Sequence, residues 1–409
     1  MKILVLTTIY KDIEDPKDAA TTPVVQNFAK EWVKLGNEVL LIHNMNVFPK
    51  VFYMVPQLVW DKLSARRGFR TILNIQQTMD ISYVNDGVKV YRSTIKKPIP
   101  LGAYSKKALE HSVEKIKSIL EENSFTPDVI ISHMENPQIY QMVKLQEVYP
   151  KAITSLVFHG IDYLNQPKYK AWKDEYLPEI DKIGFRSKQA YRQACRLIGF
   201  NREHYFLCPS GISNELVETV PDFDRKFKNG KLRILYVGQF IPRKHVETLI
   251  RAVKRILDTK SIEVSVSLIG SGIDEQNLRQ LVQSMRLERV ITFKGRQPHT
   301  AVLEEMKNSD VFVMVSENEV FGLVYTEAMS QGCVVIASTE GGMEGIVNDG
   351  MNGYMSQAGD VDALVGKLLT IVEQDREENI RLARMSYETA QKYTECAVAE
   401  EYLNHVMYD

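Results

Sequence analysis

Cysteine is scarce in this sequence, and the few cysteines are not placed to bind a metal. The 409-residue chain has four of them, Cys195, Cys208, Cys333 and Cys396. No two have the short spacing of a metal-binding pair, so a zinc site is not expected. Scattered thiols in a chain of this size are typical of a reduced protein of the cytosol. We therefore expect a cytoplasmic protein.

Long apolar runs and an excess of charge of one sign are also lacking. The first apolar residues, Met1–Leu6, lead straight into Tyr10–Asp12 and are too short for a signal peptide. No uncharged stretch of about 18 residues occurs, so no membrane-spanning helix is predicted. The formal net charge is −1, so no overall field attracts nucleic acid or a membrane. Nucleic acid is not expected as a partner.

Two sequence patterns that would indicate a cofactor or a metal are not found. No G-x-G-x-x-G follows the first predicted strand of either half, which argues against a NAD-dependent enzyme. We identify no Asp-x-Asp cluster of the kind that holds a divalent metal on a sugar diphosphate. The sequence therefore predicts a reaction that needs neither a cofactor nor a metal.

Short apolar runs alternate with amphipathic stretches over most of the chain. Several of the runs, such as Ile3–Thr7, Val129–Ser132 and Val311–Met314, are apolar on both faces, as a parallel sheet covered by helices requires. The alternation predicts right-handed crossovers and doubly wound sheets. The expected fold class is α/β, with two doubly wound Rossmann-like domains facing a cleft.

The strand–helix alternation restarts at Lys231–Gly238, after a charged stretch. Since a domain usually has roughly 100–200 residues, a chain of this length favours two domains. We place the linker near 213–230. The predicted domains are 1–212 and 213–390, followed by a C-terminal helix, 391–409, that returns to the first domain.

The most informative block is Ser316–Gly332, in which a buried strand leads through a polar loop into a helix. Gly322 lets a ligand approach the backbone closely. The helix start beyond it presents free amides with about half a positive charge, which suits a diphosphate. Glu319 and Glu327 flank this point with seven residues between them, so both can face one ligand. An ordinary helix with an acidic first turn is the alternative.

The stretch Glu319–Gly332 resembles the signature of retaining family 4 glycosyltransferases of the bacterial polysaccharide type, whose two glutamates have the same separation. The resemblance implies the two-domain GT-B fold, with a nucleotide sugar, UDP by family frequency, on the second domain and the acceptor on the first. It also implies retention of anomeric configuration. It places Glu319 near the sugar, as a catalytic residue, and Glu327 near the ribose.

The resemblance continues through Val237–Lys244, which is similar to the family's strand and loop that hold the diphosphate. Lys244 matches the family lysine and is assigned a catalytic role. The arginine that usually follows Gly238 is Gln239 here, and Arg243 restores that charge in our interpretation. The alternative is that Arg243 and Lys244 form a solvated surface pair. The remaining residues implied for donor binding are Gly270, Arg296, Phe321, Gly322, Leu323 and Val324.

The first half resembles the family less closely. Val157–Asp162 is similar to a family strand that ends in His-Gly, which implies a catalytic and acceptor-binding role for His159 and an acceptor-binding role for Asp162. A structural histidine is the alternative. Thr21 and Thr22 stand where the family often has a glycine pair, and we assign them to acceptor binding, with a simple helix cap as the alternative.

The stretch Asn46–Arg70 mixes aromatic residues with Lys50, Lys62, Arg66, Arg67 and Arg70. It is long for a connection inside an α/β unit. We interpret it as a peripheral contact with the anionic inner face of a membrane, which Lys96, Lys97, Lys106 and Lys107 extend if they fold nearby. An acceptor pocket or simple packing is the alternative.

These features together predict a retaining glycosyltransferase that moves a sugar from a nucleotide-diphosphate sugar to a glycan or lipid-linked acceptor in cell-surface polysaccharide synthesis. Two alternatives remain open at this stage. The first is a non-catalytic nucleotide-sugar-binding partner subunit. The second is an epimerase or inverting transferase of the same fold.

Overall fold

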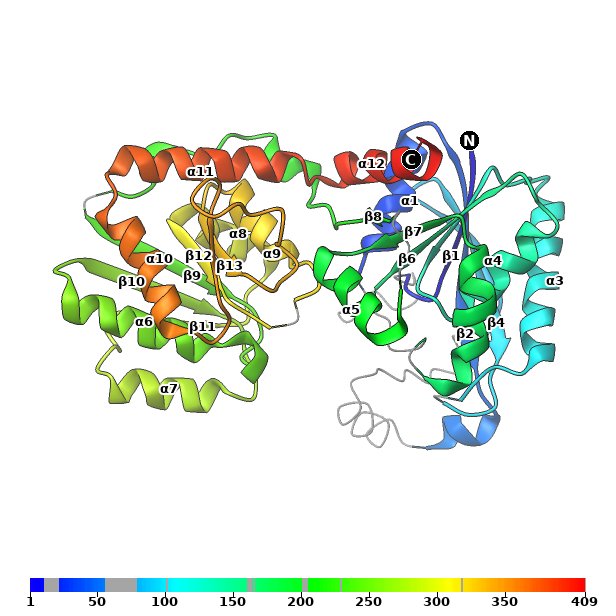
Figure 1. Ribbon diagram of the computed structural model, residues 1–409, viewed down its shortest axis with the longest axis horizontal. Helices are drawn as coiled ribbons and strands as arrows, with labels where there is room; N and C mark the ends of the chain where they lie inside the picture. The colour runs from blue at the N-terminus through cyan, green and yellow to red at the C-terminus, as the bar shows by residue number, and fades with distance from the viewer. Residues whose placement is uncertain are drawn as a thin grey trace. The chain divides into compact units, whose positions relative to one another are not determined.

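The structure is a computed structural model, and it divides the chain into two compact units (Figure 1). It describes residues 1–10, 22–55, 79–100, 102–159, 164, 166–200, 205–228, 230–317 and 319–408. The N-terminal unit contains Met1–Phe185, Arg192–Cys208 and Ala399–Asp409, and the C-terminal unit contains Arg186–Tyr191 and Pro209–Val398. The chain thus passes between the units four times: after β7, within α5, after β8 and within α12.

The N-terminal unit is built on one mixed sheet with the strand order β3-β4-β2-β1-β5-β6-β7-β8. All neighbouring strands run parallel except β3 and β4, which are antiparallel. The central strands are buried on both faces, as the apolar runs of the sequence require. The strands are β1 (Lys2–Thr7), β2 (Glu38–Val47), β3 (Ile81–Asn85), β4 (Val88–Lys96), β5 (Val129–His133), β6 (Ile153–Phe158), β7 (Lys182–Phe185) and β8 (Phe206–Leu207).

Helices cover this sheet, and the last helix of the chain is one of them. Trp32 of α1 is fully buried and its indole Nε1 donates a 3.0 Å hydrogen bond to the carbonyl of Ala399 in α12. Phe28 and Trp32 also contact the Tyr402 ring. The helical elements of this part are α1 (Val24–Lys34), η1 (Lys50–Met54), α3 (Lys106–Glu122), α4 (Gln138–Gln146), η3 (Pro167–Tyr169), η4 (Trp172–Tyr176), η5 (Leu177–Glu179), α5 (Lys188–Ile198) and α12 (Glu395–Tyr408).

The C-terminal unit has an all-parallel sheet with the order β11-β10-β9-β12-β13-β14. The order reverses direction between β9 and β12, which is the point where ligands bind in doubly wound sheets. β12 and β13 are buried along their whole length. The strands are β9 (Lys231–Val237), β10 (Glu263–Ile269), β11 (Ile291–Gly295), β12 (Val311–Met314), β13 (Val334–Ser338) and β14 (Tyr354–Ser356).

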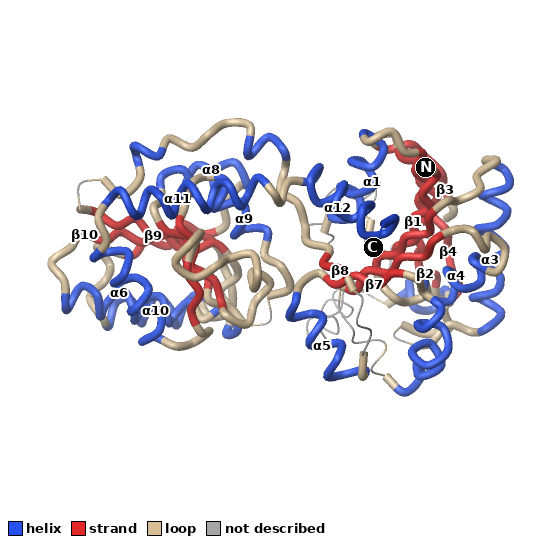
Figure 2. Tube along the Cα trace, turned by 45° about the horizontal axis from the view of Figure 1, so that its top comes forward, coloured by secondary structure: helices blue, strands red, loops and turns tan. Residues whose placement is uncertain are grey.

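Helices lie on both faces of this second sheet (Figure 2). α6 packs on α7 and α10, and α9 packs on α8 and α11. The helical elements are η6 (Asn214–Val217), η7 (Phe223–Arg225), η8 (Pro242–Lys244), α6 (Val246–Thr259), α7 (Glu275–Ser284), α8 (His299–Asn308), α9 (Leu323–Ser330), α10 (Val361–Glu373) and α11 (Arg376–Gln391). The prediction of an α/β fold with two doubly wound Rossmann-like domains is confirmed.

The structure refines two local expectations. Thr22 does not cap α1, because the N-cap position is Pro23 and no side chain caps this helix. Lys97 is not a surface residue of a basic patch, because only 7% of it is exposed, whereas Lys96, Lys106 and Lys107 are exposed. Within the described ranges, no helix is long and apolar enough to cross a bilayer.

Candidate functional site in the C-terminal unit

The first part of the site is the loop that follows β9. η8 (Pro242–Lys244) ends at His245, whose φ of 47° lies in the left-handed region and turns the chain into α6. The backbone carbonyl of Arg243 accepts a 2.8 Å hydrogen bond from Glu317 N, which fixes this loop to the one after β12. The turn leaves Lys244 buried, with 8% of the residue exposed.

The second part is the loop between β12 and α9. Gly322 occupies the N-cap of α9 with a φ of 81°, a conformation that favours glycine. A Cβ atom at this position would lie 2.7 Å from the Tyr325 ring. The Tyr325 hydroxyl donates to the carbonyl of Met314, which holds the start of the helix against the end of the strand. Burial, with Glu319 nearby, raises the pKa of Tyr325, so this phenol stays a neutral donor.

Lys244 and Glu319 join these two loops. The Lys244 ammonium donates to Glu319 Oε2, and its Nζ lies 3.5 Å from the Met314 sulfur. Arg243 Nη1 lies 3.7 Å from the same carboxylate oxygen. The carboxylate neutralises a lysine that would otherwise be buried without a counter-charge. An ammonium has three donors, so Lys244 can retain Glu319 and still donate to a ligand oxygen.

Glu327 has a partner that the sequence did not indicate. His299, the first residue of α8, places its Nε2 2.9 Å from Glu327 Oε1. This hydrogen bond raises the pKa of His299. His299 and Glu327 both line the neighbouring cavity.

A cavity of about 480 Å³ brings these groups together at the carboxyl ends of β9 and β12. Seven of the predicted donor residues line it: Gly238, Gln239, Arg243, Lys244, Glu319, Val324 and Glu327. Sequence reasoning missed five others, Val237, Gln297, His299, Val302 and Met314. Gln297 and His299 follow the carboxyl end of β11, and that position was the only available signal for them.

The remaining predicted donor residues do not line this cavity, although Gly270 packs against Gly238, which does. Gly270 has no room for a side chain, since a Cβ atom would lie 1.8 Å from the Gly238 carbonyl oxygen. Arg296 is exposed, and its Nε donates a 2.8 Å hydrogen bond to Ser271 Oγ. Phe321 is buried, whereas Gly322 and Leu323 are partly exposed at the start of α9.

The predicted acceptor residues belong to the other unit. His159 follows β6, and its Nε2 lies 2.9 Å from Nδ1 of His133 at the end of β5. His133 was not predicted, although it also ends a buried strand. Thr22 is exposed before α1. Thr21, Asp162 and residues 56–70 of the basic-aromatic stretch lie outside the described residues.

In the part of the chain that the structure describes, no group of three or more His, Cys, Asp or Glu side chains is placed to bind a metal ion. Two Asp-x-Asp pairs do exist in the sequence, and each begins a helix. Asp222 Oδ1 accepts from Asp224 N in η7, and Asp360 Oδ1 accepts from Ala363 N in α10. Independence from a metal stays a prediction.

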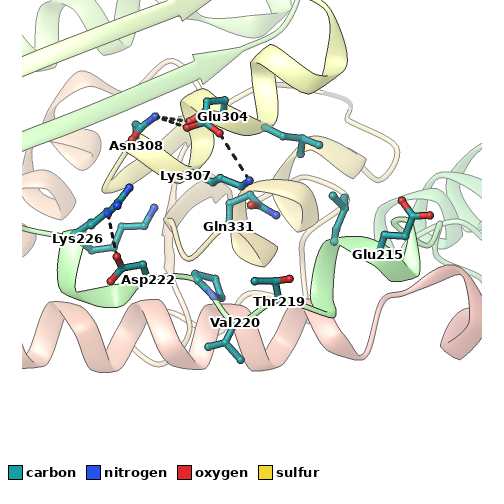
Figure 3. Close-up of a pocket in the computed structure, with 13 residues that line it drawn as sticks. Glu215, Thr219, Val220, Asp222, Lys226, Glu304, Lys307, Asn308 and Gln331 are labelled. Carbon is teal, nitrogen blue, oxygen red and sulfur yellow. Dashed lines mark hydrogen bonds and ion pairs between the residues drawn. The ribbon is translucent and has the colours of Figure 1, made fainter.

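A second cavity of about 430 Å³ lies elsewhere on the C-terminal unit (Figure 3). Two ion pairs lie along its lining, and Lys226 donates to the carbonyls of Met306 and Ser309. Lys307 lies 3.8 Å from Glu304, and Arg225 lies 3.0 Å from Asp222. It contains none of the predicted site residues, and its paired charges leave no obvious group for an anionic ligand.

The C-terminal unit, which contains the first cavity, matches a known protein family. Residues 220–392 match the family of glycosyl transferases group 1. This match covers β9 to α11, and therefore every residue of the first cavity.

Individual relatives are similar over parts of the chain. A sulfoquinovosyl transferase of Arabidopsis thaliana is 31% identical over 186 residues, which are 42% of this chain and 34% of that protein. A lipopolysaccharide core biosynthesis glycosyltransferase of Rhizobium meliloti is 31% identical over 171 residues, which are 42% of this chain and 48% of that protein. The chain thus aligns with between a third and a half of the length of these relatives.

Solved structures resemble the chain over its full length. HepE of Anabaena, solved in complex with UDP, has a TM-score of 0.65 and 17% identity, with 99% of each chain covered. A glycosyltransferase of Rickettsia africae has a TM-score of 0.66 and 12% identity, covering 100% of this chain and 99% of that one. At these identities the likeness shows the fold, which is that of two-domain GT-B proteins.

Proposed function

We propose that the chain is a retaining glycosyltransferase of family 4 that uses a nucleoside diphosphate sugar, with UDP as the nucleotide. The observation that carries the proposal is the cavity in which Lys244, Glu319 and Glu327 meet beside the start of α9. The match to glycosyl transferases group 1 over the same residues supports it. The UDP in the similarly folded HepE structure supports the choice of nucleotide.

In this proposal the donor lies along the carboxyl ends of the strands. The diphosphate is held by Lys244, Arg243 and the free amides at the start of α9, because these groups together form a positively charged binding site. Glu319 binds the sugar hydroxyls, and Glu327, oriented by His299, accepts hydrogen bonds from the ribose. The base extends toward Gly270 and Arg296.

The reaction breaks the bond between the anomeric carbon and the diphosphate oxygen, and it forms a bond between that carbon and an acceptor hydroxyl on the same face. The hydroxyl proton passes to the departing diphosphate, so no enzyme nucleophile is needed. Lys244 stabilises the negative charge that develops on the leaving group. His159, Asp162, Thr21 and Thr22 belong to the acceptor side.

The acceptor in this proposal is a glycan or a lipid-linked sugar of a cell-surface polysaccharide, met at the inner face of a membrane. η1 supports a surface contact, since Val51 and Met54 are 62% and 82% exposed beside Lys50. Exposed apolar residues next to a basic one suit the interface of an anionic bilayer.

A thermal-shift panel of UDP-, GDP- and ADP-sugars tests the donor assignment, because a ligand of the native state raises its melting temperature. We expect the UDP-sugar to give the largest shift, followed by slow release of free UDP. Binding without any release of nucleotide would indicate a non-catalytic binding subunit. Loss of all three shifts in the Lys244→Met variant would place the binding in the described cavity.

The transfer is also expected to continue in EDTA, because Lys244 and the start of α9 supply the positive charge that a metal would otherwise provide. The measurement is UDP release with and without the chelator. Activity that disappears in EDTA and returns with manganese or magnesium would show that a metal is required.

A further inference from the structure

The three buried lysines of the described chain differ in what surrounds their ammonium groups. Lys244 is paired with Glu319, as described above. Lys226 is 1% exposed and donates to the carbonyls of Met306 and Ser309. Lys97 is 7% exposed, and among the described residues neither a carboxylate nor a carbonyl accepts from its Nζ. A buried charge without a counter-charge is costly, and proteins rarely keep one without a use.

Lys97 is held in place from two sides. It follows the carboxyl end of β4, where its backbone N donates a 2.8 Å hydrogen bond to the carbonyl of Val47 in β2. Its Nζ lies 4.8 Å from the centre of the Tyr104 ring. The Tyr104 hydroxyl donates to Asn46, so the ring is fixed to the end of β2 as well. An aromatic face attracts a cation but does not neutralise it.

A second lysine contributes positive charge near Lys97. Lys168 of η3 is exposed, and its Nζ lies 5.1 Å from the Tyr169 ring. Tyr169 is buried and accepts a 3.0 Å hydrogen bond from Asn136 Nδ2, which anchors η3 beyond the end of β5. Burial, and then the nearby charge of Lys168, lowers the pKa of Lys97 to about 8. An anion bound to the Lys97 ammonium would offset both the cost of its burial and the repulsion from Lys168.

We propose that Lys97 and Lys168 form a binding site for an anionic group, of the phosphate type, on the N-terminal unit. The site lies beyond the carboxyl ends of β4 and β6, the edge at which ligands bind in doubly wound sheets. The inference rests on the proposed function, because only in a glycosyltransferase would an anion bound on this unit belong to the acceptor. The acceptor is then a phosphorylated sugar or the headgroup of a phospholipid-like carrier.

The test is a titration of the full chain with inorganic phosphate, followed by thermal shift, with the C-terminal cavity saturated with UDP. We expect a phosphate-dependent rise in melting temperature in the wild type. In Lys97→Met the apparent phosphate affinity should fall roughly ten- to hundredfold, because a charge-assisted hydrogen bond is lost. Lys168→Met, an exposed substitution that leaves the core intact, should weaken the affinity in the same direction.

Lys96→Met is the matched control, since Lys96 is the exposed residue that ends β4, directly before Lys97. It should respond to phosphate like the wild type. Phosphate also stabilises proteins in general by exclusion from their surface, and that effect is common to all variants. Only the difference between Lys97→Met and Lys96→Met therefore counts. Equal responses in these two variants, or no response in the wild type, would overturn the anion site.

A second experiment, with vesicles of phosphatidylglycerol, distinguishes a lipid headgroup from a soluble acceptor as the source of the anion. If Lys97→Met loses vesicle binding together with the phosphate response, the anion is a lipid headgroup. If it loses the phosphate response alone, the anion belongs to a soluble acceptor. Repeating the phosphate titration without nucleotide in a Lys244→Met background keeps the test valid if UDP does not bind. A failure of the donor proposal is then distinguishable from a failure of the anion site.

Discussion

Lys244 and Lys97 are buried to nearly the same degree, 8% and 7% exposed, yet their surroundings differ. Lys244 belongs to a site whose charges are balanced within the unit, through Glu319. Lys97 faces an aromatic ring and a second lysine. A lysine that is paired with a carboxylate already has a fixed position before the ligand binds. On binding it either leaves the carboxylate or donates to the carboxylate and the ligand together. Because no carboxylate of the described residues contacts Lys97, this lysine depends on a ligand for its counter-charge in our proposal. The buried lysine of the C-terminal unit is therefore neutralised before a ligand binds, whereas the buried lysine of the N-terminal unit is neutralised by the ligand.

Lys244→Met is expected to have the largest effect. The substitution keeps the aliphatic stem and removes the charge that stabilises the leaving group, so turnover should fall by roughly 10²- to 10³-fold. The measurement is the initial rate of UDP release at saturating donor. Lys254→Met, at a partly exposed lysine of α6 paired with Asp258, is the control and should keep its rate. Unchanged turnover in a folded Lys244→Met protein would remove this lysine from the reaction.

The next effect concerns the stability of the protein without ligand at alkaline pH. The pKa of Lys97 is lowered from 10.5 to about 8 in the folded chain. Between these values the unfolded state binds more protons, so the free energy of unfolding should rise with pH, by up to about 3 kcal/mol. Below about pH 8 both states are protonated and the penalty of the buried charge is complete.

Lys97→Met removes this part of the pH dependence, and the difference from the wild type isolates it from the titration of tyrosines. Urea unfolding at several pH values measures it. Among the described residues, Lys168 is the charged group that lowers the pKa of Lys97. Lys168→Met should therefore raise that pKa and narrow the pH range over which stability increases. A wild type and a Lys97→Met variant with parallel pH profiles would contradict the assignment of an uncompensated charge.

Glu327→Ala is expected to weaken donor binding by tenfold or more, since a hydrogen bond to a charged group contributes about 1.5–3 kcal/mol. The loss should appear in the KM for the nucleotide sugar and leave the phosphate response of the N-terminal unit unchanged. Such a result would show that donor binding in the C-terminal unit and phosphate binding in the N-terminal unit are independent. Equal kinetics in a folded variant would exclude Glu327 from the site.

His299→Gln should have the smallest effect, because an amide can still donate to Glu327 and orient it. We expect a modest rise in the KM for the donor, together with the loss of any pH dependence that arises from the raised pKa of His299. Isothermal titration with UDP on both sides of that pKa measures it. A loss as large as that of Glu327→Ala would mean that the histidine itself contacts the ligand.

Local patterns in the sequence were sufficient to predict the two sheets and the β12–α9 part of the site. The buried strand, Gly322 and the helix start are adjacent in the chain, and their chemistry follows from that order. The pairing of Lys244 with Glu319 spans 75 positions and depends on β9 and β12 being neighbours. The contact between His299 and Glu327 depends in the same way on the packing of α8 against α9.

The N-terminal unit was harder to predict because its polar groups are distributed over loops after several strands. A lysine pair such as Lys96 and Lys97 has no local signal for which member is buried. Burial is decided by the hydrogen bond of the Lys97 backbone to Val47 and by Tyr104, both remote in sequence. The alternative interpretation of Thr22 as a helix cap was wrong because Pro23, whose fixed φ suits a helix start, takes the N-cap position.

The return of α12 to the N-terminal unit has a consequence for the order of events during synthesis. Trp32 and Phe28 need Ala399 and Tyr402 to complete their surroundings, but Pro209–Val398 must be made first. At about 5–20 residues per second, the ribosome needs roughly 10–40 s for that stretch. During this interval the apolar face of α1 lacks its cover. The C-terminal unit is therefore free to fold before the unit that precedes it in the chain is complete.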